Sequence, residues 1–224
     1  MELSSILDAA KSGNLQELKE LLSEDGDLNK TSQNGVSPLI LAAEHNNADI
    51  VSYLLEQGAD PNLTTTMGGT ALSRAAENGH LTVMKQLLNH DAKVSDRALI
   101  VAAREGSLGA VKLLVDKGAN INAQQRWGQT ALMLAAREGH SMIVKFLLAQ
   151  GADAKLRDKN NDSALSMALD NDHGEIAAQL RRAGAQAHRS KNAEPELEED
   201  DEDDISGETD FDDLVDEDEM LDDD

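Results

Sequence analysis

Short apolar pairs recur along this chain at nearly constant intervals, and this spacing limits the fold more than any other feature. The alanine pairs are Ala9-Ala10, Ala42-Ala43, Ala75-Ala76, Ala102-Ala103 and Ala135-Ala136, with Ala168-Leu169 as the sixth copy. From the first member of one pair to the first member of the next, the intervals are 33, 33, 27, 33 and 33. A second set of pairs, from Leu21-Leu22 to Leu180-Arg181, has the same five intervals. Because two markers agree, the chain contains six copies of one unit.

The clearest copy of the unit occupies residues 127–153 and predicts two helices. Gly139 and His140 separate the two helical patterns. In the second pattern apolar residues recur at i, i+1, i+4 and i+5, which is one face of a helix. Gly151 ends that helix, because a glycine past the last apolar pair takes the left-handed backbone that satisfies terminal carbonyls. The apolar positions are Ala131, Leu132, Ala135 and Ala136, then Ile143, Val144, Leu147 and Leu148.

Two recurring motifs place the sequence in a family. Helices begin at Ser37-Pro38-Leu39, Thr70-Ala71-Leu72 and Thr130-Ala131-Leu132, and units end at Gly58-Ala59-Asp60, Gly118-Ala119-Asn120 and Gly151-Ala152-Asp153. Over residues 3 to 186 the chain resembles the ankyrin-repeat family. The resemblance implies an all-α repeat solenoid of helix-turn-helix units with short β-hairpin fingers. The histidine that usually follows Thr-Pro-Leu is replaced by Ile40, Ser73, Ile100, Met133 or Ser166.

The array is expected to span residues 1–187, with units at 1–31, 32–64, 65–94, 95–124, 125–157 and 158–187. Six residues are missing between the third and fourth units, where Leu99 follows Ala92 by seven residues but Leu72 follows Ala59 by thirteen. The deletion falls on the finger of the fourth unit. We predict a short turn at residues 95–97 and a notch in the row of fingers. The notch is either a cleft for a partner or a tolerated loop deletion.

The acidity of the chain belongs to its last residues. Of the net charge of −23, residues 193–224 contribute 20 Asp and Glu with no Lys or Arg. We predict that the tail, residues 188–224, is disordered when free, because its few apolar residues cannot offset the entropy of ordering. Phe211, Leu214 and Val215 have i, i+3, i+4 spacing and are expected to form a short helix on a partner. The tail either solubilises the chain, binds a basic client or contacts arginines of the array.

No residue pattern in the sequence indicates catalysis, a cofactor or a bound metal. His80, His140 and His173 recur with the repeat, which favours a structural role, and no histidine pair has zinc-site spacing. The chain has no cysteine, no signal-like N-terminus and no membrane-spanning run. We therefore expect a non-enzymatic monomer without cofactor or membrane contact. The cytoplasm is the expected compartment, with the nucleus as the alternative.

Candidate binding residues follow from the resemblance, which places partner contacts on the finger tips and on the two residues after each alanine pair. Trp127 is the only tryptophan and lies at a predicted finger tip, and tryptophan and arginine are enriched among residues that dominate binding energies. The alternative is that Trp127 packs over the neighbouring finger. The other candidates on the array are Arg126, Arg137, Arg104, Met67, Glu44, His45 and Glu77, and the arginines are expected to lie close together.

The sequence as a whole predicts a protein-binding adaptor that uses the concave ankyrin face. The acidic tail extends this hypothesis to a chaperone or escort of a basic protein, such as a histone-like or ribosomal-protein-like client. The alternative is a regulator or inhibitor that mimics nucleic acid and blocks a basic surface. Direct nucleic-acid binding is not expected, because a strongly negative chain repels phosphate.

Overall fold

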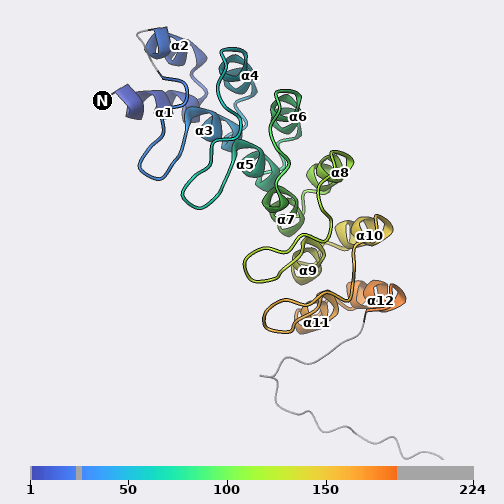
Figure 1. The fold of residues 1–224 in the computed structure, drawn as a ribbon. Helices are drawn as coiled ribbons and strands as arrows, with labels where there is room; N and C mark the ends of the chain where they lie inside the picture. Colours follow the sequence, from blue (N-terminus) through green and yellow to red (C-terminus); the bar gives the residue numbers. More distant parts are fainter. Residues whose placement is uncertain (1, 24–26, 186–224) are drawn as a thin grey trace, which may run out of the picture. The chain divides into compact units, whose positions relative to one another are not determined.

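The computed structural model describes residues 2–23 and 27–185 (Figure 1). The chain divides into two units, residues 1–192, which contain the array, and residues 193–224. The candidate residues Phe211, Leu214 and Val215, and the predicted disorder of the tail, lie outside the described residues.

Each repeat contributes two short helices that contact one another. The first helices are α1 (Glu2–Ser12), α3 (Pro38–Glu44), α5 (Ala71–Glu77), α7 (Asp96–Arg104), α9 (Ala131–Arg137) and α11 (Ala164–Asp170). The second helices are α2 (Leu15–Ser23), α4 (Ala48–Glu56), α6 (Leu81–Asn89), α8 (Leu108–Asp116), α10 (Ser141–Ala149) and α12 (Gly174–Arg182). The first helices contact one another in chain order (Figure 1). The second helices α4, α6, α8, α10 and α12 contact one another in the same way and form a second row. The predicted repeat architecture is confirmed.

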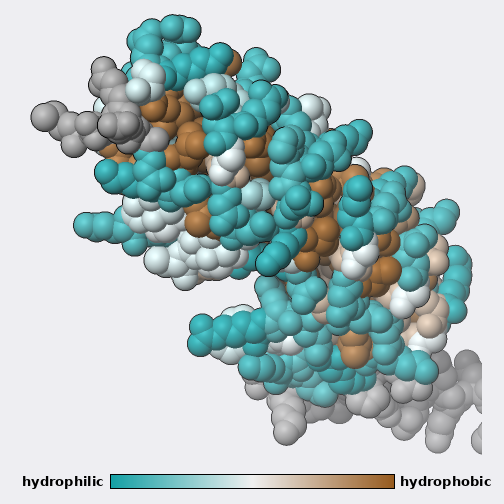
Figure 2. All heavy atoms as spheres, turned by 45° about the horizontal axis from the view of Figure 1, so that its top comes forward, coloured by the Kyte–Doolittle hydropathy of each residue, from teal (hydrophilic) through white to brown (hydrophobic). Residues whose placement is uncertain are grey.

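The alanine pairs form the interior of the row of first helices. In the five Ala-Ala pairs both members are buried, and most have no exposed surface. A methyl side chain lets neighbouring helices approach closely, so the pairs allow each unit to stack on the next. Leucines at equivalent places on the second helices, including Leu54, Leu87 and Leu114, are fully buried and belong to the same core. Figure 2 shows polar side chains over much of the surface in view, with hydrophobic residues visible between them.

Hydroxyl side chains start the first helices from the second unit onward. The Ser37, Thr70, Ser95, Thr130 and Ser163 side chains each accept a hydrogen bond from a backbone N–H in the first turn. Two hydroxyls also stand where the family usually has histidine. Ser73 and Ser166 complete capping boxes with Thr70 and Ser163, because each hydroxyl accepts from the N–H of the cap residue.

Three histidines tie their units to the unit before. Each of these residues, His80, His140 and His173, directly precedes the second helix of its unit. Their Nε2 atoms lie 3.1, 2.8 and 3.0 Å from the carbonyl oxygen of the last residue in the first helix of the unit before. A carbonyl oxygen can only accept, so each Nε2 carries the hydrogen. In the second unit Asn47 makes the equivalent contact through its amide, 2.7 Å from Ala10 O. These contacts assign the histidines the structural role that their recurrence predicts.

The fourth unit lacks a finger, but its connection differs from the predicted turn at residues 95–97. Loops project before α3, α5, α9 and α11, whereas α6 is joined to α7 by a short segment (Figure 1). Helix α6 ends at Asn89 and α7 begins at Asp96, so residues 90–95 form the connection. Of the three residues predicted to form the turn, only Ser95 lies in this connection, and Asp96 and Arg97 are helical. Ser95 caps α7. Helices α5 and α9 follow a finger and begin four residues before their alanine pairs, whereas α7 follows no finger and begins six residues before Ala102-Ala103.

The core predicts how a mutation in the middle of the array acts. Leu114 on α8 is fully buried, so Leu114→Ala should lower the free energy of unfolding by about 2–5 kcal/mol through lost contacts and a residual cavity. Urea unfolding followed by circular dichroism measures this change. The control is Met142→Ala, which removes a side chain that is 63% exposed. This control should shift the free energy of unfolding by less than about 0.5 kcal/mol. Equal losses in the two variants would contradict this description of the core.

Candidate protein-binding surface

Four fingers with the same backbone pattern project from the described part of the array. They comprise residues 32–36, 65–69, 125–129 and 158–162 and are called fingers 2, 3, 5 and 6 after their units. In each finger the N–H of the first residue donates to the carbonyl of the fifth residue, and the N–H of the fourth residue donates to the carbonyl of the first. The N to O distances are 2.7–3.0 Å. The fourth residue has a positive φ and is Gly35, Gly68, Gly128 or Asn161, residue types that adopt this conformation at low cost. Of the described residues, only Arg157 and Ser163 form a β-bridge, so the fingers are turns without regular strands.

The finger tips expose two large apolar side chains. Met67 on finger 3 is 76% exposed and Trp127 on finger 5 is 62% exposed. The guanidinium carbon of Arg126 lies 6.0 Å from the centre of the Trp127 ring, within range of a cation–π interaction. Most of the indole surface is open, which favours the binding role over the alternative that Trp127 packs over the neighbouring finger.

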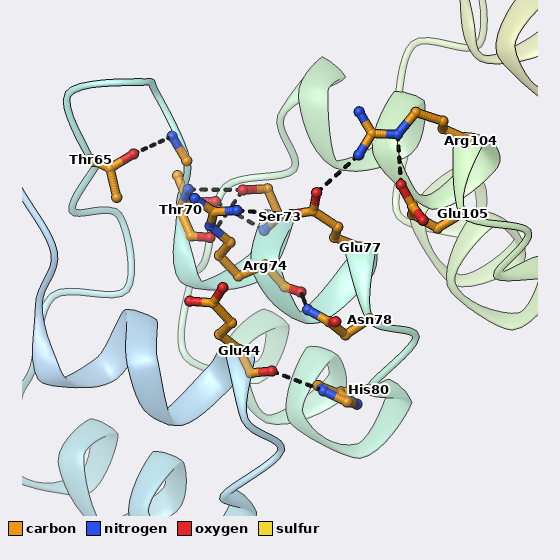
Figure 3. Close-up of polar contacts among 11 residues, drawn as sticks. Glu44, Thr65, Thr70, Ser73, Arg74, Glu77, Asn78, His80, Arg104 and Glu105 are labelled. Atoms are coloured by element: carbon orange, nitrogen blue, oxygen red, sulfur yellow. Dashed lines mark hydrogen bonds and ion pairs between the residues drawn. The ribbon is translucent and has the colours of Figure 1, made fainter. Parts of the chain in front are cut away.

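A row of charged side chains follows the ends of the first helices (Figure 3). Glu77 on α5 bridges two arginines, with Arg74 and Arg104 each 3.0 Å from one of its carboxylate oxygens. Arg104 on α7 also contacts Glu105 at 2.6 Å. The pKa of Arg104 is raised above its ordinary value, mainly because its side chain donates a hydrogen bond to Glu105. Partial burial of the guanidinium opposes this rise in pKa. Glu77 thus joins the third unit to the fourth through partly exposed charge.

The three candidate arginines belong to two neighbouring units, but each has partners of its own. Arg104 ends α7 and Arg137 ends α9, the next first helix. Arg137 pairs with its neighbour Glu138 at 2.9 Å, whereas Arg104 pairs with Glu77 and Glu105. Arg126 lies against Trp127 on finger 5. Among the described residues no carboxylate joins these arginines to one another. That the three arginines lie close together on one surface stays a prediction.

The remaining candidates of the array lie toward its N-terminal half. The carbonyl of Glu44 accepts the hydrogen bond of His80 (Figure 3). His45 is exposed and contacts Leu41 O through its Nδ1 at 3.0 Å. The structure therefore spreads the predicted binding residues along several units.

Arg74 is the one member of the charged row that the sequence analysis does not single out. Its side chain lies against finger 3, since a Cβ placed on Gly69 would stand 3.4 Å from its Nε. The spacing of Arg74 and Glu77 is i, i+3, which brings opposite charges together on a helix and was the available signal. These ion pairs are partly exposed and contribute about 0–1 kcal/mol each. Their main effect is to orient charged groups that a partner can engage.

Within the described residues no cluster of His, Cys, Asp or Glu has the arrangement of a metal site. The same residues contain no helix with the length and apolarity needed to cross a membrane. The chemistry that this surface offers is therefore that of exposed apolar tips, paired charges and backbone groups.

Stacked pairs of short helices with projecting fingers define a class of helical repeat proteins. The chain belongs to the ankyrin-repeat family, whose model, described as ankyrin repeats (3 copies), matches residues 6–98 and 99–191. None of the curated proteins matches the sequence.

Three solved structures resemble the chain. The human ASB11 ankyrin repeat domain has a TM-score of 0.76 and 26% identity, over 83% of this chain and 86% of that chain. A chain from the complex of the predatory endopeptidase Bd0816 of Bdellovibrio bacteriovorus with immunity protein Bd3460 has a TM-score of 0.72 and 30% identity, over 80% and 97%. An ankyrin repeat domain of Acinetobacter baumannii AYE, ABAYE2397, has a TM-score of 0.71 and 30% identity, over 81% and 98%.

The exposure of Trp127 predicts a simple spectroscopic signature. Because this is the only tryptophan, the emission of the folded chain should already resemble that of an indole in water and should be quenched readily by acrylamide. Unfolding in urea should shift the emission maximum little. The Trp127→Phe variant provides the blank. A folded chain with blue-shifted emission and weak quenching would contradict the exposed position.

Finger 6 predicts a pH dependence of stability. One carboxylate oxygen of Asp162 is buried without a partner among the described residues, and burial, followed by the charge of Asp158, raises the pKa of Asp162. A raised pKa in the folded state means that Asp162 supports folding while protonated, and that this support is lost as the pH rises through the folded value.

The substitution Asp162→Asn should therefore raise the melting temperature at pH 7. This gain should vanish below about pH 4, where the carboxyl of the unfolded chain is also protonated. Thermal unfolding at both pH values measures the effect. Asp153→Asn, at an exposed carboxylate that accepts from Lys155 N at 2.8 Å, is the matched control and should give no such gain. A pH-independent effect of Asp162→Asn would contradict the role of charge.

Proposed function

We propose that the protein is a non-enzymatic adaptor that binds a protein partner through its fingers and the ends of its first helices. Ankyrin repeats are general protein–protein interaction modules, and this chain belongs to that family. The observation that carries the proposal is the exposed Trp127 beside Arg126 at a finger tip. An exposed indole has no role in the core, and tryptophan and arginine supply much of the energy of many interfaces.

The charged row supports the same surface. Glu77, Arg74 and Arg104 are already held in place by their mutual contacts, so little side-chain entropy would be lost when a partner engages them. Arg137 and Glu138 offer a second pair one unit further along. Alternating charges of this kind favour a partner with complementary charges over a uniformly acidic or basic one. Glu44, His45 and Met67 extend the surface toward the N-terminal half.

We propose a second arm for the acidic tail. Residues 193–224 of the tail carry 20 Asp and Glu with no Lys or Arg. This run of carboxylates suits a basic client, such as a histone-like or ribosomal-protein-like chain, that the protein would escort as a chaperone. Phe211, Leu214 and Val215 would provide the apolar contacts of this arm. The protein would act as a monomer in the cytoplasm, with the nucleus as the alternative site, and would not bind nucleic acid or membranes directly.

A second candidate function is inhibition of an enzyme or regulator. The similarity to a chain from an endopeptidase–immunity protein complex favours it, because that solved structure pairs a protease with an immunity protein. In the form suggested by the tail, the carboxylates would mimic phosphates and cover a basic nucleic-acid-binding surface. Competition between this protein and DNA or RNA for one partner would distinguish this function from an escort.

Affinity capture from a cell extract tests the proposal. The full chain and a chain that ends at His188 are compared at low and high salt, with bound proteins identified by mass spectrometry. The shorter chain keeps the fold, since the buried residues and helix contacts of the described structure lie between residues 2 and 185. If the tail is an escort arm, basic proteins should bind the full chain and be released by truncation or salt.

The array itself is tested with one partner that both chains retain. Trp127→Ala should weaken its binding by about thirtyfold or more, because loss of an interface tryptophan commonly costs about 2 kcal/mol. Met142→Ala, on α10, removes an equally exposed apolar side chain away from the fingers and should leave binding unchanged. Titration by isothermal calorimetry measures both. Full affinity in Trp127→Ala would refute the adaptor surface proposed here.

A further inference from the structure

Neighbouring fingers are joined by a repeated backbone hydrogen bond. The second residue of one finger donates its N–H to the carbonyl of the third residue of the finger before it. Thr66 N lies 2.9 Å from Asn34 O, which joins fingers 2 and 3, and Lys159 N lies 3.0 Å from Trp127 O, which joins fingers 5 and 6. Each pair of fingers is thus a small unit with an accepting carbonyl on one edge and a donating N–H on the other.

The missing finger of the fourth unit interrupts this chain of hydrogen bonds. By the same rule, finger 3 should offer Met67 O to a following finger, and finger 5 should donate from Arg126 N to a preceding one. Among the described residues neither group has a hydrogen-bond partner. The gap between fingers 3 and 5 therefore has one free acceptor on one wall and one free donor on the other.

The glycines at the fourth finger position show independently that the gap is open. A Cβ on Gly35 would stand 2.8 Å from Thr64 O of the segment that leads into finger 3, and one on Gly128 would stand 3.1 Å from the Cα of Asp158. A Cβ on Gly68 would meet no atom within 4 Å. Fingers 2 and 5 are thus covered by a following finger, whereas finger 3 is not.

The side chains around the gap are apolar and basic. Finger 3, on one side, carries the exposed Met67, and finger 5, on the other, carries the exposed Arg126 and Trp127. At the base, α7 exposes Asp96 and Arg97 in its first turn. Fingers 3 and 5 carry no acidic residue, so the two arginines outnumber the one carboxylate. This border is complementary to a segment that brings a carboxylate and an apolar side chain.

We propose that the gap between fingers 3 and 5 binds the tip of an acidic turn from a partner protein, which takes the place of the missing finger. One residue of that turn donates its N–H to Met67 O, and the next residue accepts from Arg126 N through its carbonyl. A carboxylate of the turn lies toward Arg126 and Arg97, and an apolar side chain packs on Met67. The inference rests on the proposed adaptor function and names the place and the chemistry of contact.

The probe is a library of disulfide-closed hairpin peptides displayed on phage and selected against the full chain. Selected peptides are synthesised and titrated while the fluorescence of Trp127 is followed, since this is the only tryptophan of the chain. We expect selection of turns with Asp or Glu at the tip, and a change in Trp127 emission on binding. Replacing the tip carboxylate by its amide should weaken binding several-fold.

Two variants of one residue separate the backbone donor from the side chain. Arg126→Ala removes the guanidinium and keeps the N–H, whereas Arg126→Pro removes both. Residue 126 is the second residue of a turn in which Gly128 N lies 2.7 Å from Gln125 O. The second position of such a turn accepts proline. Arg126→Pro should bind the selected hairpins about tenfold more weakly than Arg126→Ala, the effect of one hydrogen bond in an interface.

The matched control is Gln33→Pro. Gln33 is the second residue of finger 2, its N–H has no partner among the described residues, and it faces away from the gap because finger 3 follows on the other edge. This variant should bind the hairpins with unchanged affinity. The urea unfolding midpoint of each variant shows that the fold is retained.

Equal affinities of Arg126→Pro and Arg126→Ala, or selection of hairpins without acidic tips, would overturn the inference. Failure to select any hairpin would overturn it as well. The adaptor function is judged separately, by the effect of Trp127→Ala on a captured partner. If that partner depends on Trp127 but not on the N–H of residue 126, the adaptor function stands and the gap is only a loop deletion.

Discussion

The structure depends on the close packing of alanine pairs along the row of first helices. Each pair is buried between neighbouring units, where a larger side chain would separate them. The other contacts between units follow from this spacing. The histidines before the second helices reach the carbonyls of the preceding unit, and the fingers stand near enough to exchange backbone hydrogen bonds, because the first helices lie so close.

Stability and recognition are divided between different parts of each unit. The interior is apolar and nearly uniform from unit to unit, as a repeat array requires if each unit is to stack on the next. Variation is concentrated at the finger tips and the ends of the first helices, where Trp127, Met67 and the row from Arg74 to Glu105 lie. A substitution there changes what the surface can bind without changing the core.

The short fourth unit combines both kinds of change. The deletion leaves the alanine pair Ala102-Ala103 buried, so the stack continues, and α7 begins directly after Ser95 instead of following a finger. The hydrogen bonds that would cross the missing finger are left open at Met67 and Arg126. A loss of six residues thereby turns a continuous row of fingers into two pairs with a gap between them.

The sequence by itself determined the number of units, the helices, the buried face and the site of the missing finger, because these depend on local periodicity and on residue types such as glycine at positive φ. It did not determine that Asp96 and Arg97 are helical, that Arg74 joins Glu77 and Arg104, or that Arg137 pairs with Glu138 instead. These features were decided by the tertiary structure. Contacts between units join groups that are far apart in the sequence, as at His140 and Arg104, which are 36 residues apart. Their geometry depends on how the units stack, and the periodicity of the sequence predicts that the units stack but not which side chains meet across the junctions.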